Sequence, residues 1–168
     1  MTPPDIGVTM TTAEIESLLA SNGHGVLSLA NDNRAYGIPI SFAYDAAKSR
    51  IILEFVTNED SKKASFLETT TEATLTVHTF ETAEAWESVI VTGPLEELRD
   101  TDVADRAAAQ FFAQADDAAA DTRWRDDADI DRSWFTLCPS DMSGRHGGIL
   151  PHQHARGLVR YSDYDRTY

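Results

Sequence analysis

The amino-acid sequence predicts an α+β fold in which mostly antiparallel strands form a barrel and helices pack against its outside. The predicted strands follow one another through short turns, without a helix between each pair, which excludes a doubly wound parallel sheet. The order of elements is helix, three strands, short helix, two strands, helix, strand. With 168 residues, 42% of them hydrophobic, the chain is long enough and apolar enough to bury one core.

The first helix is predicted over residues 11–22. Thr11 and Glu14 have the spacing of a capping box, in which each side chain binds the backbone of the other residue. One apolar helical face follows, made of Ile15, Leu18 and Leu19. Asn22-Gly23 supplies the signal that ends the helix.

Three strands come next, and two turns join them: strands 25–30, 34–44 and 50–57, with turns at 31–33 and 45–49. In the second strand, Ile38, Ile40 and Phe42 recur at the period of two that is typical of a strand. Pro39 lies among them. Because proline has no amide hydrogen, we expect a position where the strand ladder needs no donor.

The remaining predicted elements are a short helix, two strands, a longer helix and a last strand, over residues 61–68, 73–80, 88–98, 102–115 and 134–138. Thr101 is the expected N-cap of the longer helix. Residues 116–132 are rich in aspartate and are interpreted as a solvated loop or a short helix.

The chain divides into a folded domain, residues 1–145, and a tail, residues 146–168. The tail shows no hydrophobic period and is expected to be a weakly ordered extension. His152 and His154 within it have the spacing of a metal-binding pair, although a solvated pair is the simpler interpretation.

The charge balance excludes several classes of function. The 28 acidic and 14 basic residues give a net charge of −14, which argues against binding of nucleic acid. No apolar run is long enough for a membrane span, and the first residues lack a secretory pattern. A single cysteine, Cys138, excludes an internal disulfide and favours the cytoplasm. Only three of the bases are lysines, and such an acidic, lysine-poor surface suggests a halophilic source.

Two of these three lysines mark a candidate binding site. Ser61 is expected to cap the short helix, and Lys62 and Lys63 follow in its first turn. Cations are unfavourable at a helix N-terminus, but a bound anion such as phosphate reverses that effect. The alternative is that Glu59 and Asp60 pair with the two lysines at the surface.

The sequence contains neither a GxGxxG motif after a strand nor a Walker loop. The chain therefore lacks the sequence motifs that bind dinucleotides and nucleoside triphosphates. A ligand with a phosphate at one end and a planar body at the other could lie along the barrel wall. The strand over residues 36–42, with backbone groups left free around Pro39, would border the planar part.

Four segments together resemble the pyridoxamine 5'-phosphate oxidase-like flavin-binding superfamily: residues 35–42, 51–58, 61–63 and 88–95. The chain looks most like the small flavin-nucleotide-binding proteins related to nitroimidazole-resistance proteins. The segment 141–145, which contains Ser143-Gly144-Arg145, is similar to the closing signature of that branch. The resemblance covers about residues 11–145.

The resemblance implies a split β-barrel that binds FMN at a homodimer interface. By position, the isoalloxazine ring would be lined by Ile38, Pro39, Ile40 and Ser41. Val56 and Thr57 would border the ribityl chain, and Ser61, Lys62 and Lys63 would hold the phosphate. Ser88 would lie near the ring, and Trp86 would cover it. Pyridoxamine phosphate oxidases have Arg in place of Lys62 and Gln in place of Ser88, so oxidation of vitamin B6 is not assigned.

Three functions remain open at this point. The first is an FMN-dependent oxidoreductase that acts on a small electrophilic or planar substrate. In such an enzyme the flavin carries the electrons and no side chain needs to act as acid or base. The second is a flavin-nucleotide-binding protein without turnover. The third is an oxidoreductase that holds the deazaflavin F420 in the same barrel.

Overall fold

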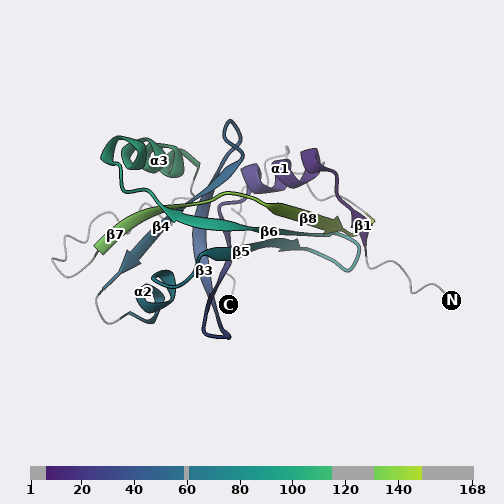
Figure 1. Ribbon diagram of the computed structural model, residues 1–168. Helices are drawn as coiled ribbons and strands as arrows, with labels where there is room; N and C mark the ends of the chain where they lie inside the picture. Colours follow the sequence, from purple (N-terminus) through teal and green to yellow (C-terminus); the bar gives the residue numbers. More distant parts are fainter. Residues whose placement is uncertain (1–6, 59–60, 115–130, 149–168) are drawn as a thin grey trace, which may run out of the picture.

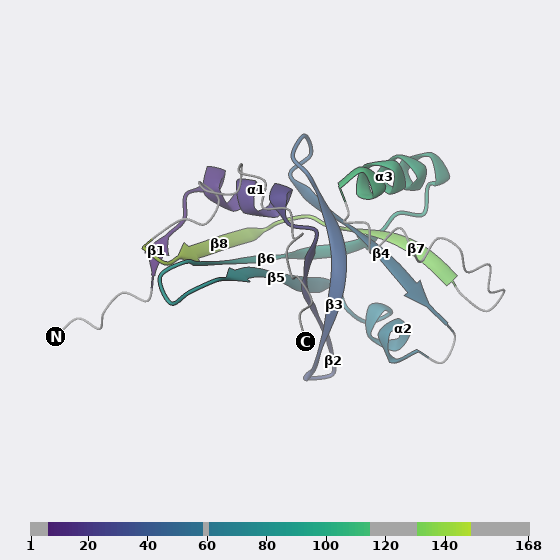
Figure 2. The same ribbon diagram turned by 180° about the vertical axis from the view of Figure 1, so that it is seen from behind.

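A computed structural model describes residues 7–58, 61–114 and 131–148 of the protein. Eight strands form one sheet in the order β1-β8-β6-β5-β2-β3-β4-β7, and every pair in it is antiparallel. An additional pairing between β6 and β7 closes most of the sheet into a ring, with the helices outside it (Figures 1 and 2). The predicted α+β barrel is confirmed.

The described strands are β1 (Val8–Thr9), β2 (His24–Asn31), β3 (Arg34–Asp45), β4 (Arg50–Thr57), β5 (Glu72–Phe80), β6 (Trp86–Glu97), β7 (Asp131–Leu137) and β8 (Asp141–His146). The described helices are α1 (Thr12–Ser21), α2 (Lys62–Leu67) and α3 (Thr101–Gln114). Within the described residues, no helix is long and apolar enough to cross a membrane.

Two long strands change partners along their length, and this change shapes the barrel. The first part of β3 pairs with β2, and from Phe42 onward β3 pairs with β4. Likewise β6 pairs with β5 up to Pro94 and with β8 up to Thr92, and from Leu95 onward it pairs with β7. Beyond the Phe42–Leu53 pair, β3 and β4 separate, which leaves a split in the wall with α2 close by.

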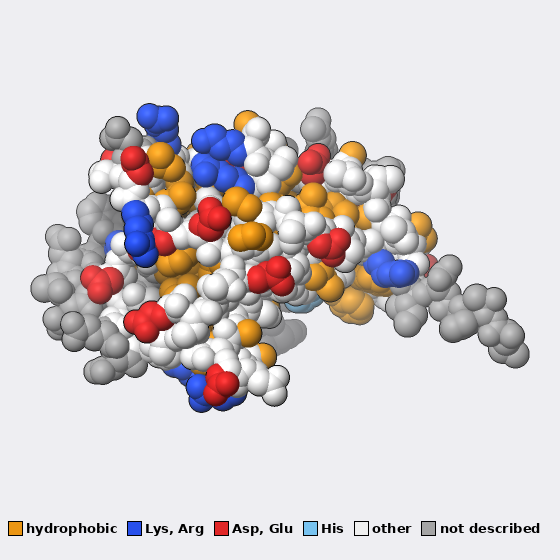
Figure 3. Space-filling model, viewed as in Figure 1, with side chains coloured by type: hydrophobic (Ala, Val, Ile, Leu, Met, Phe, Trp, Pro, Cys, Tyr) orange, Lys and Arg blue, Asp and Glu red, His pale blue; other side chains and the backbone are white. Residues whose placement is uncertain are grey.

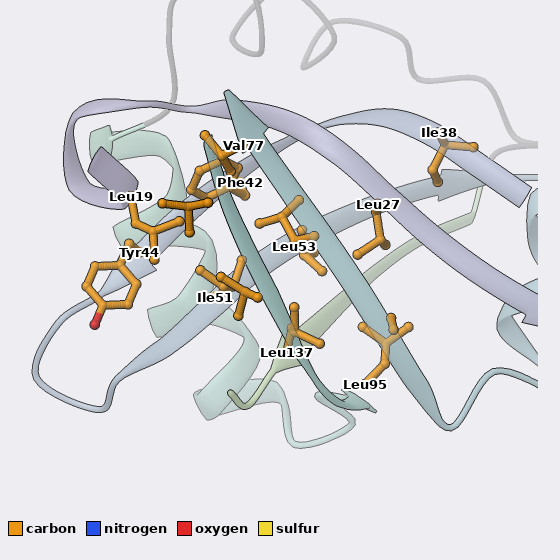
Figure 4. Packing of buried hydrophobic residues seen from close by; sticks show 14 of the residues in the cluster. Leu19, Leu27, Ile38, Phe42, Tyr44, Ile51, Leu53, Val77, Leu95 and Leu137 are labelled. Atoms are coloured by element: carbon orange, nitrogen blue, oxygen red, sulfur yellow. The ribbon is translucent and has the colours of Figure 1, made fainter. Parts of the chain in front are cut away.

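The inner faces of the strands form one apolar core. Its side chains alternate with outward-facing ones, as the period of a strand requires. Figure 4 shows side chains from α1 and from the barrel strands that face a common interior, with Ile38 at one end and Tyr44 at the other. Leu27, Leu53 and Leu75 are fully buried. Burial of a side chain of this size contributes about 1.5–3 kcal/mol, so the core is the main source of stability.

Helix α1 forms as predicted. Thr11 Oγ1 accepts from the Glu14 amide, and the Glu14 carboxylate accepts from the Thr11 amide at 2.7 Å, so the capping box is complete. The apolar face made of Ile15, Leu18 and Leu19 is buried in the core.

Helix α3 covers a second, smaller cluster on the outside of the barrel. Phe111 is buried against Ile52 and packs edge-on against Trp134 of β7, with ring centroids 5.3 Å apart. Gln114 Oε1 accepts a hydrogen bond from the Tyr44 amide at 3.1 Å, which ties the end of the helix to β3.

The expected N-cap of α3 was wrong by one residue. Thr101 lies inside the helix, and Asp100 is the cap, because its carboxylate accepts from the Val103 amide at 3.2 Å. We therefore expect Asp100→Ala to lower the free energy of unfolding by about 1 kcal/mol, as loss of a helix cap does. Thr101→Ala is the matched control and should change it by no more than a few tenths of a kcal/mol. Urea denaturation of both variants measures the difference, and equal effects would restore Thr101 as the cap.

Two strands were not predicted. β1 has only two residues, and the short β8 was recognised only as a signature. β8 extends to His146, which is buried and paired with both Val8 and Glu87. Most of the aspartate-rich stretch and the segment with His152 and His154 lie outside the described residues.

The β3–β4 turn is closed by a largely buried ion pair. Arg50 Nε lies 3.0 Å from the Asp45 carboxylate. Burial by itself raises the pKa of Asp45, but hydrogen bonds from Arg50 and Gln110 and the charge of Arg50 outweigh it, so the net pKa is below its ordinary value of 3.8.

Because the pKa of Asp45 is lowered in the folded state, its stabilising contribution is present above pH 3.8 and is lost as the pH falls through the folded value. We expect wild-type protein to be more stable than Asp45→Asn at pH 6, and the difference to shrink below about pH 4. Urea midpoints between pH 6 and pH 3 measure it, and a difference that stays constant over this range would contradict the assignment.

Candidate functional site

The site begins where β4 ends and α2 starts, beside the split in the wall. Ser61 is the N-cap of α2, and its hydroxyl accepts from the Ala64 amide at 3.0 Å, as the sequence predicted. Lys62 and Lys63 are the first two residues of the helix. Because α2 has only six residues, its dipole is weaker than that of a long helix, and the two ammonium groups provide most of the positive charge here.

Both lysine side chains rest against the barrel. Lys63 Nζ donates to the backbone oxygen of Val56 at 3.0 Å, which joins α2 to β4. Lys62 Nζ lies over the ring of Tyr36 on β3, 4.6 Å from its centroid, a cation–π contact. The two ammonium groups are therefore held at the split, one beside each of the two strands that separate there.

The sequence analysis missed two residues that belong to this cluster, Tyr36 and Arg34. The Tyr36 ring packs on Phe66 of α2 with centroids 5.1 Å apart, and the Arg34 guanidinium lies 5.9 Å from the Phe66 centroid. Tyr36 continues the inward period of Ile38, Ile40 and Phe42, so its place beside the core could have been predicted. Nothing in the sequence shows that Arg34 approaches α2.

No carboxylate among the described residues pairs with Arg34, Lys62 or Lys63. Glu59 and Asp60, the alternative partners of the lysines, lie outside the described residues. Acidic and basic side chains are both scattered over the face in Figure 3, and one group of basic side chains lies at its lower edge. A concentration of cations in a chain of net charge −14 is suited to bind an anionic group.

The predicted ring-lining residues lie along the free edge of β3. Ile38 points into the core and is 7% exposed, whereas Pro39 faces outward, and Ile40 and Ser41 are half-buried. These four residues pair with β2 on one edge only, because pairing with β4 starts at Phe42. The other edge is open toward the split, as expected for a strand that tolerates Pro39.

Val56 and Thr57 lie on the opposite side of the split, on the part of β4 that no longer pairs with β3. Both are half-buried, and both pair with β7 on their other edge. The two lysines thus lie between the unpaired parts of β3 and β4, since Lys62 contacts Tyr36 and Lys63 contacts Val56. Backbone groups of the open edge of β3 can form hydrogen bonds with a planar ligand, and the two ammonium groups can donate hydrogen bonds to a phosphate.

The structure does not bring Trp86 and Ser88 to this split. Both lie at the start of β6, next to the β5–β6 turn, and α2 lies at the opposite end of the molecule in both ribbon views (Figures 1 and 2). Trp86 packs instead beside Gly7, where its ring leaves no space for a side chain, and near Gly147. Within one chain, the predicted site residues therefore form two separate groups.

The second group lies on the outer face of the sheet, together with two histidines, His24 and His78. His24 starts β2 and pairs with Ser41, while His78 pairs with Ser88. Around them this face carries small or uncharged side chains, including Val26, Pro39, Thr76 and Ile90. Ile90 is 44% exposed, and Phe80 nearby is 70% exposed.

Solved structures with this architecture come from several bacteria. An FAD-binding protein from Mesorhizobium loti is 22% identical with a TM-score of 0.65, and the match covers 82% of this chain and 96% of that one. An FAD-binding protein from Mycobacterium smegmatis is 20% identical with a TM-score of 0.60 and the same coverage. A candidate 5-nitroimidazole antibiotic resistance protein from Bacteroides thetaiotaomicron is 12% identical, with a TM-score of 0.62, and the match covers 82% of this chain and 85% of that one.

At these identities the structural likeness shows the fold alone. No curated protein matches the chain. The family described as pyridoxamine 5'-phosphate oxidase matches residues 11–146, which include the split, α2 and both groups of site residues. The match spans most of the chain, and the protein therefore belongs to the pyridoxamine 5'-phosphate oxidase family.

Proposed function

We propose that this protein binds FMN and works as an oxidoreductase on a small electrophilic or planar substrate. The observation that carries the proposal is the pair of ammonium groups of Lys62 and Lys63, which are held at the split and have no acidic partner among the described residues. In a chain with three lysines and a net charge of −14, this arrangement suits a phosphate monoester.

The residues around the split fit the rest of such a ligand. Ser61, Lys62 and Lys63 would bind the phosphate, and Val56 and Thr57 would border the ribityl chain. Residues 38–41 offer backbone groups along an open strand edge for the ring. Bound flavin would supply electron transfer, while the protein binds it, orients it and shields it from water.

We further propose that two copies of the chain form the complete site. Trp86 and Ser88 lie away from the lysines within one chain, so a site that uses both groups needs a second copy. The outer face of the sheet suits this contact, because its central rows are uncharged although the chain is strongly acidic. Charged residues are depleted at the centre of interfaces.

Light scattering of the purified protein should give the mass of a dimer. A monomer at micromolar concentration would contradict the proposal that two copies form the site.

The visible spectrum of the purified protein tests the cofactor. Bound FMN should give a yellow protein with absorbance near 450 nm, whereas the deazaflavin F420 absorbs near 420 nm. Mass spectrometry of the ligand released by heat separates FMN from FAD, which the relatives from Mesorhizobium loti and Mycobacterium smegmatis are described as binding. A colourless protein that also fails to take up added FMN would contradict the proposal.

Reduction without oxygen separates the enzyme from a flavin carrier. We expect NADH or NADPH to bleach the yellow protein, because an oxidoreductase must accept electrons from a donor. Photochemical reduction of the same sample is the control that shows the bound flavin to be reducible. If the flavin bleaches only on photochemical reduction and not with NADH or NADPH, the protein is better described as a flavin carrier without turnover.

We also propose membership in the branch related to nitroimidazole-resistance proteins, a halophilic source and a cytoplasmic location. The halophilic source is supported by the low lysine content and the acidic surface. The melting temperature should rise between low and molar salt, because screening reduces the repulsion among carboxylates. A melting temperature that falls between low and molar salt would contradict the halophilic source.

A further inference from the structure

Two histidines are exposed on the outer face of the sheet, away from the lysine pair. His24 is the first residue of β2, and His78 is near the end of β5. Neither imidazole makes a hydrogen bond or an ion pair with another described residue. The proposed flavin site does not assign a role to either of them.

The register of β2 and β5 points His24 and His78 toward each other. The ladder runs from Ser28–Thr74 to Val26–Thr76, and the same register continued by two residues would place His24 opposite His78. The strands remain in contact at that end, because a Cβ added to Gly25 would lie 2.8 Å from the Thr76 oxygen and 3.2 Å from Val77 Cγ2. Opposite residues on one face of an antiparallel pair have Cβ atoms about 4.5–5.5 Å apart.

We propose that His24 and His78 form a binding site for a divalent late transition metal ion, such as Cu²⁺, Ni²⁺ or Zn²⁺. Neutral imidazole is a preferred ligand of these ions, with metal–nitrogen distances of about 2.0–2.1 Å for zinc. Two rings on neighbouring strands can reach one ion from the same side. The rigid sheet presents both rings without the entropy cost of ordering a loop.

The neighbours of the two histidines support the site. Ser41 is paired with His24, and Ser88 is paired with His78, so a hydroxyl stands next to each ring. A ring nitrogen that does not bind the metal can donate its hydrogen to such an oxygen, which fixes the orientation of the ring. The net charge of −14 raises the local concentration of cations, whereas the charge of Arg145, paired with Ser88, opposes binding.

The site is open. The described residues contain no group of three or more potential metal ligands, so the two histidines leave coordination positions for water or another ligand. The same face is proposed above to meet a second copy, and a bound ion would then lie at that contact. The site itself uses residues of one chain and does not depend on a bound flavin.

Titration of the full-length protein with Zn²⁺ and Ni²⁺, followed by calorimetry, tests the proposal. His24→Gln and His78→Gln should each weaken binding at this site by about tenfold or more, because each removes one of two ligands. With Cu²⁺, electron paramagnetic resonance should show two nitrogen ligands in the wild type and their loss in either variant.

The matched control is His152→Gln with His154→Gln, which removes the other pair of histidines that has metal-binding spacing. This variant should retain the two-nitrogen signal of the sheet site. If the wild type binds no ion, or if His24→Gln and His78→Gln together leave binding and the copper signal unchanged, the proposal is overturned. Circular dichroism of each variant shows whether the fold is kept.

Discussion

Gly93→Ala is expected to lower the free energy of unfolding by about 3 kcal/mol or more, or to prevent folding. Gly93 lies on β6 just before this strand changes partners to β7. A Cβ at this position would lie 1.9 Å from the backbone oxygen of Cys138 and 3.0 Å from the Ser140 amide nitrogen. Backbone cannot move aside as a flexible side chain can, so the contact between β6 and the β7–β8 connection would have to open.

Gly37→Ala is the matched control, because it adds the same methyl group to another strand of the barrel. Its Cβ would meet only Val26 Cγ1 at 3.5 Å, an ordinary van der Waals distance. We expect a change within about 1 kcal/mol, and a small gain is possible since alanine restricts the unfolded chain more than glycine does. Urea denaturation of both variants measures the difference. Equal destabilisation would show that a general loss of glycine, and not the close approach at Gly93, is responsible.

Lys62→Glu combined with Lys63→Glu should abolish retention of the flavin. The two changes replace two positive charges with two negative ones where the phosphate is proposed to bind, and repulsion then replaces charge-assisted hydrogen bonds. A loss of at least about 100-fold in the affinity of the apo-protein for FMN is expected, since each such bond contributes about 1.5–3 kcal/mol. Quenching of FMN fluorescence during titration measures this affinity.

The control for this variant is Lys48→Glu with Arg106→Glu, which changes the net charge by the same amount at exposed positions on the β3–β4 turn and α3. Its affinity for FMN should stay close to that of the wild type. The lysine variant should also keep most of its stability, although Lys63 loses its hydrogen bond to Val56. Unchanged affinity in a folded lysine variant would refute the phosphate assignment.

Most of the fold could be predicted because the barrel strands carry a strong hydrophobic period. Residues 50–57 were predicted with the bounds that β4 has, and the capping box marked the start of α1. β8 was not predicted as a strand, because its sequence DMSGRH has few apolar residues. Its stability comes from pairing with β6 and β1, which are far from it in sequence.

The same holds for the candidate site: some of its features are local in the sequence, and others depend on contacts between distant segments. Ser61 and the lysines could be recognised because a cap and two cations are local features of the sequence. The contacts of Lys62 with Tyr36 and of Lys63 with Val56 join separate elements, so they depend on how the chain folds back. The separation of Trp86 and Ser88 from the lysines could not be foreseen, because strand order alone determines it.

The strand β6 pairs with three neighbours, β5, β8 and β7, and its pairing with β7 closes the ring of strands around the core. Its amides should consequently exchange with deuterium only through global unfolding, whereas those of α2 and the neighbouring edge of β3 can open locally. We therefore expect β6 to open last and the region around α2 and the edge of β3 to open first. The ligand is proposed to enter at this second region.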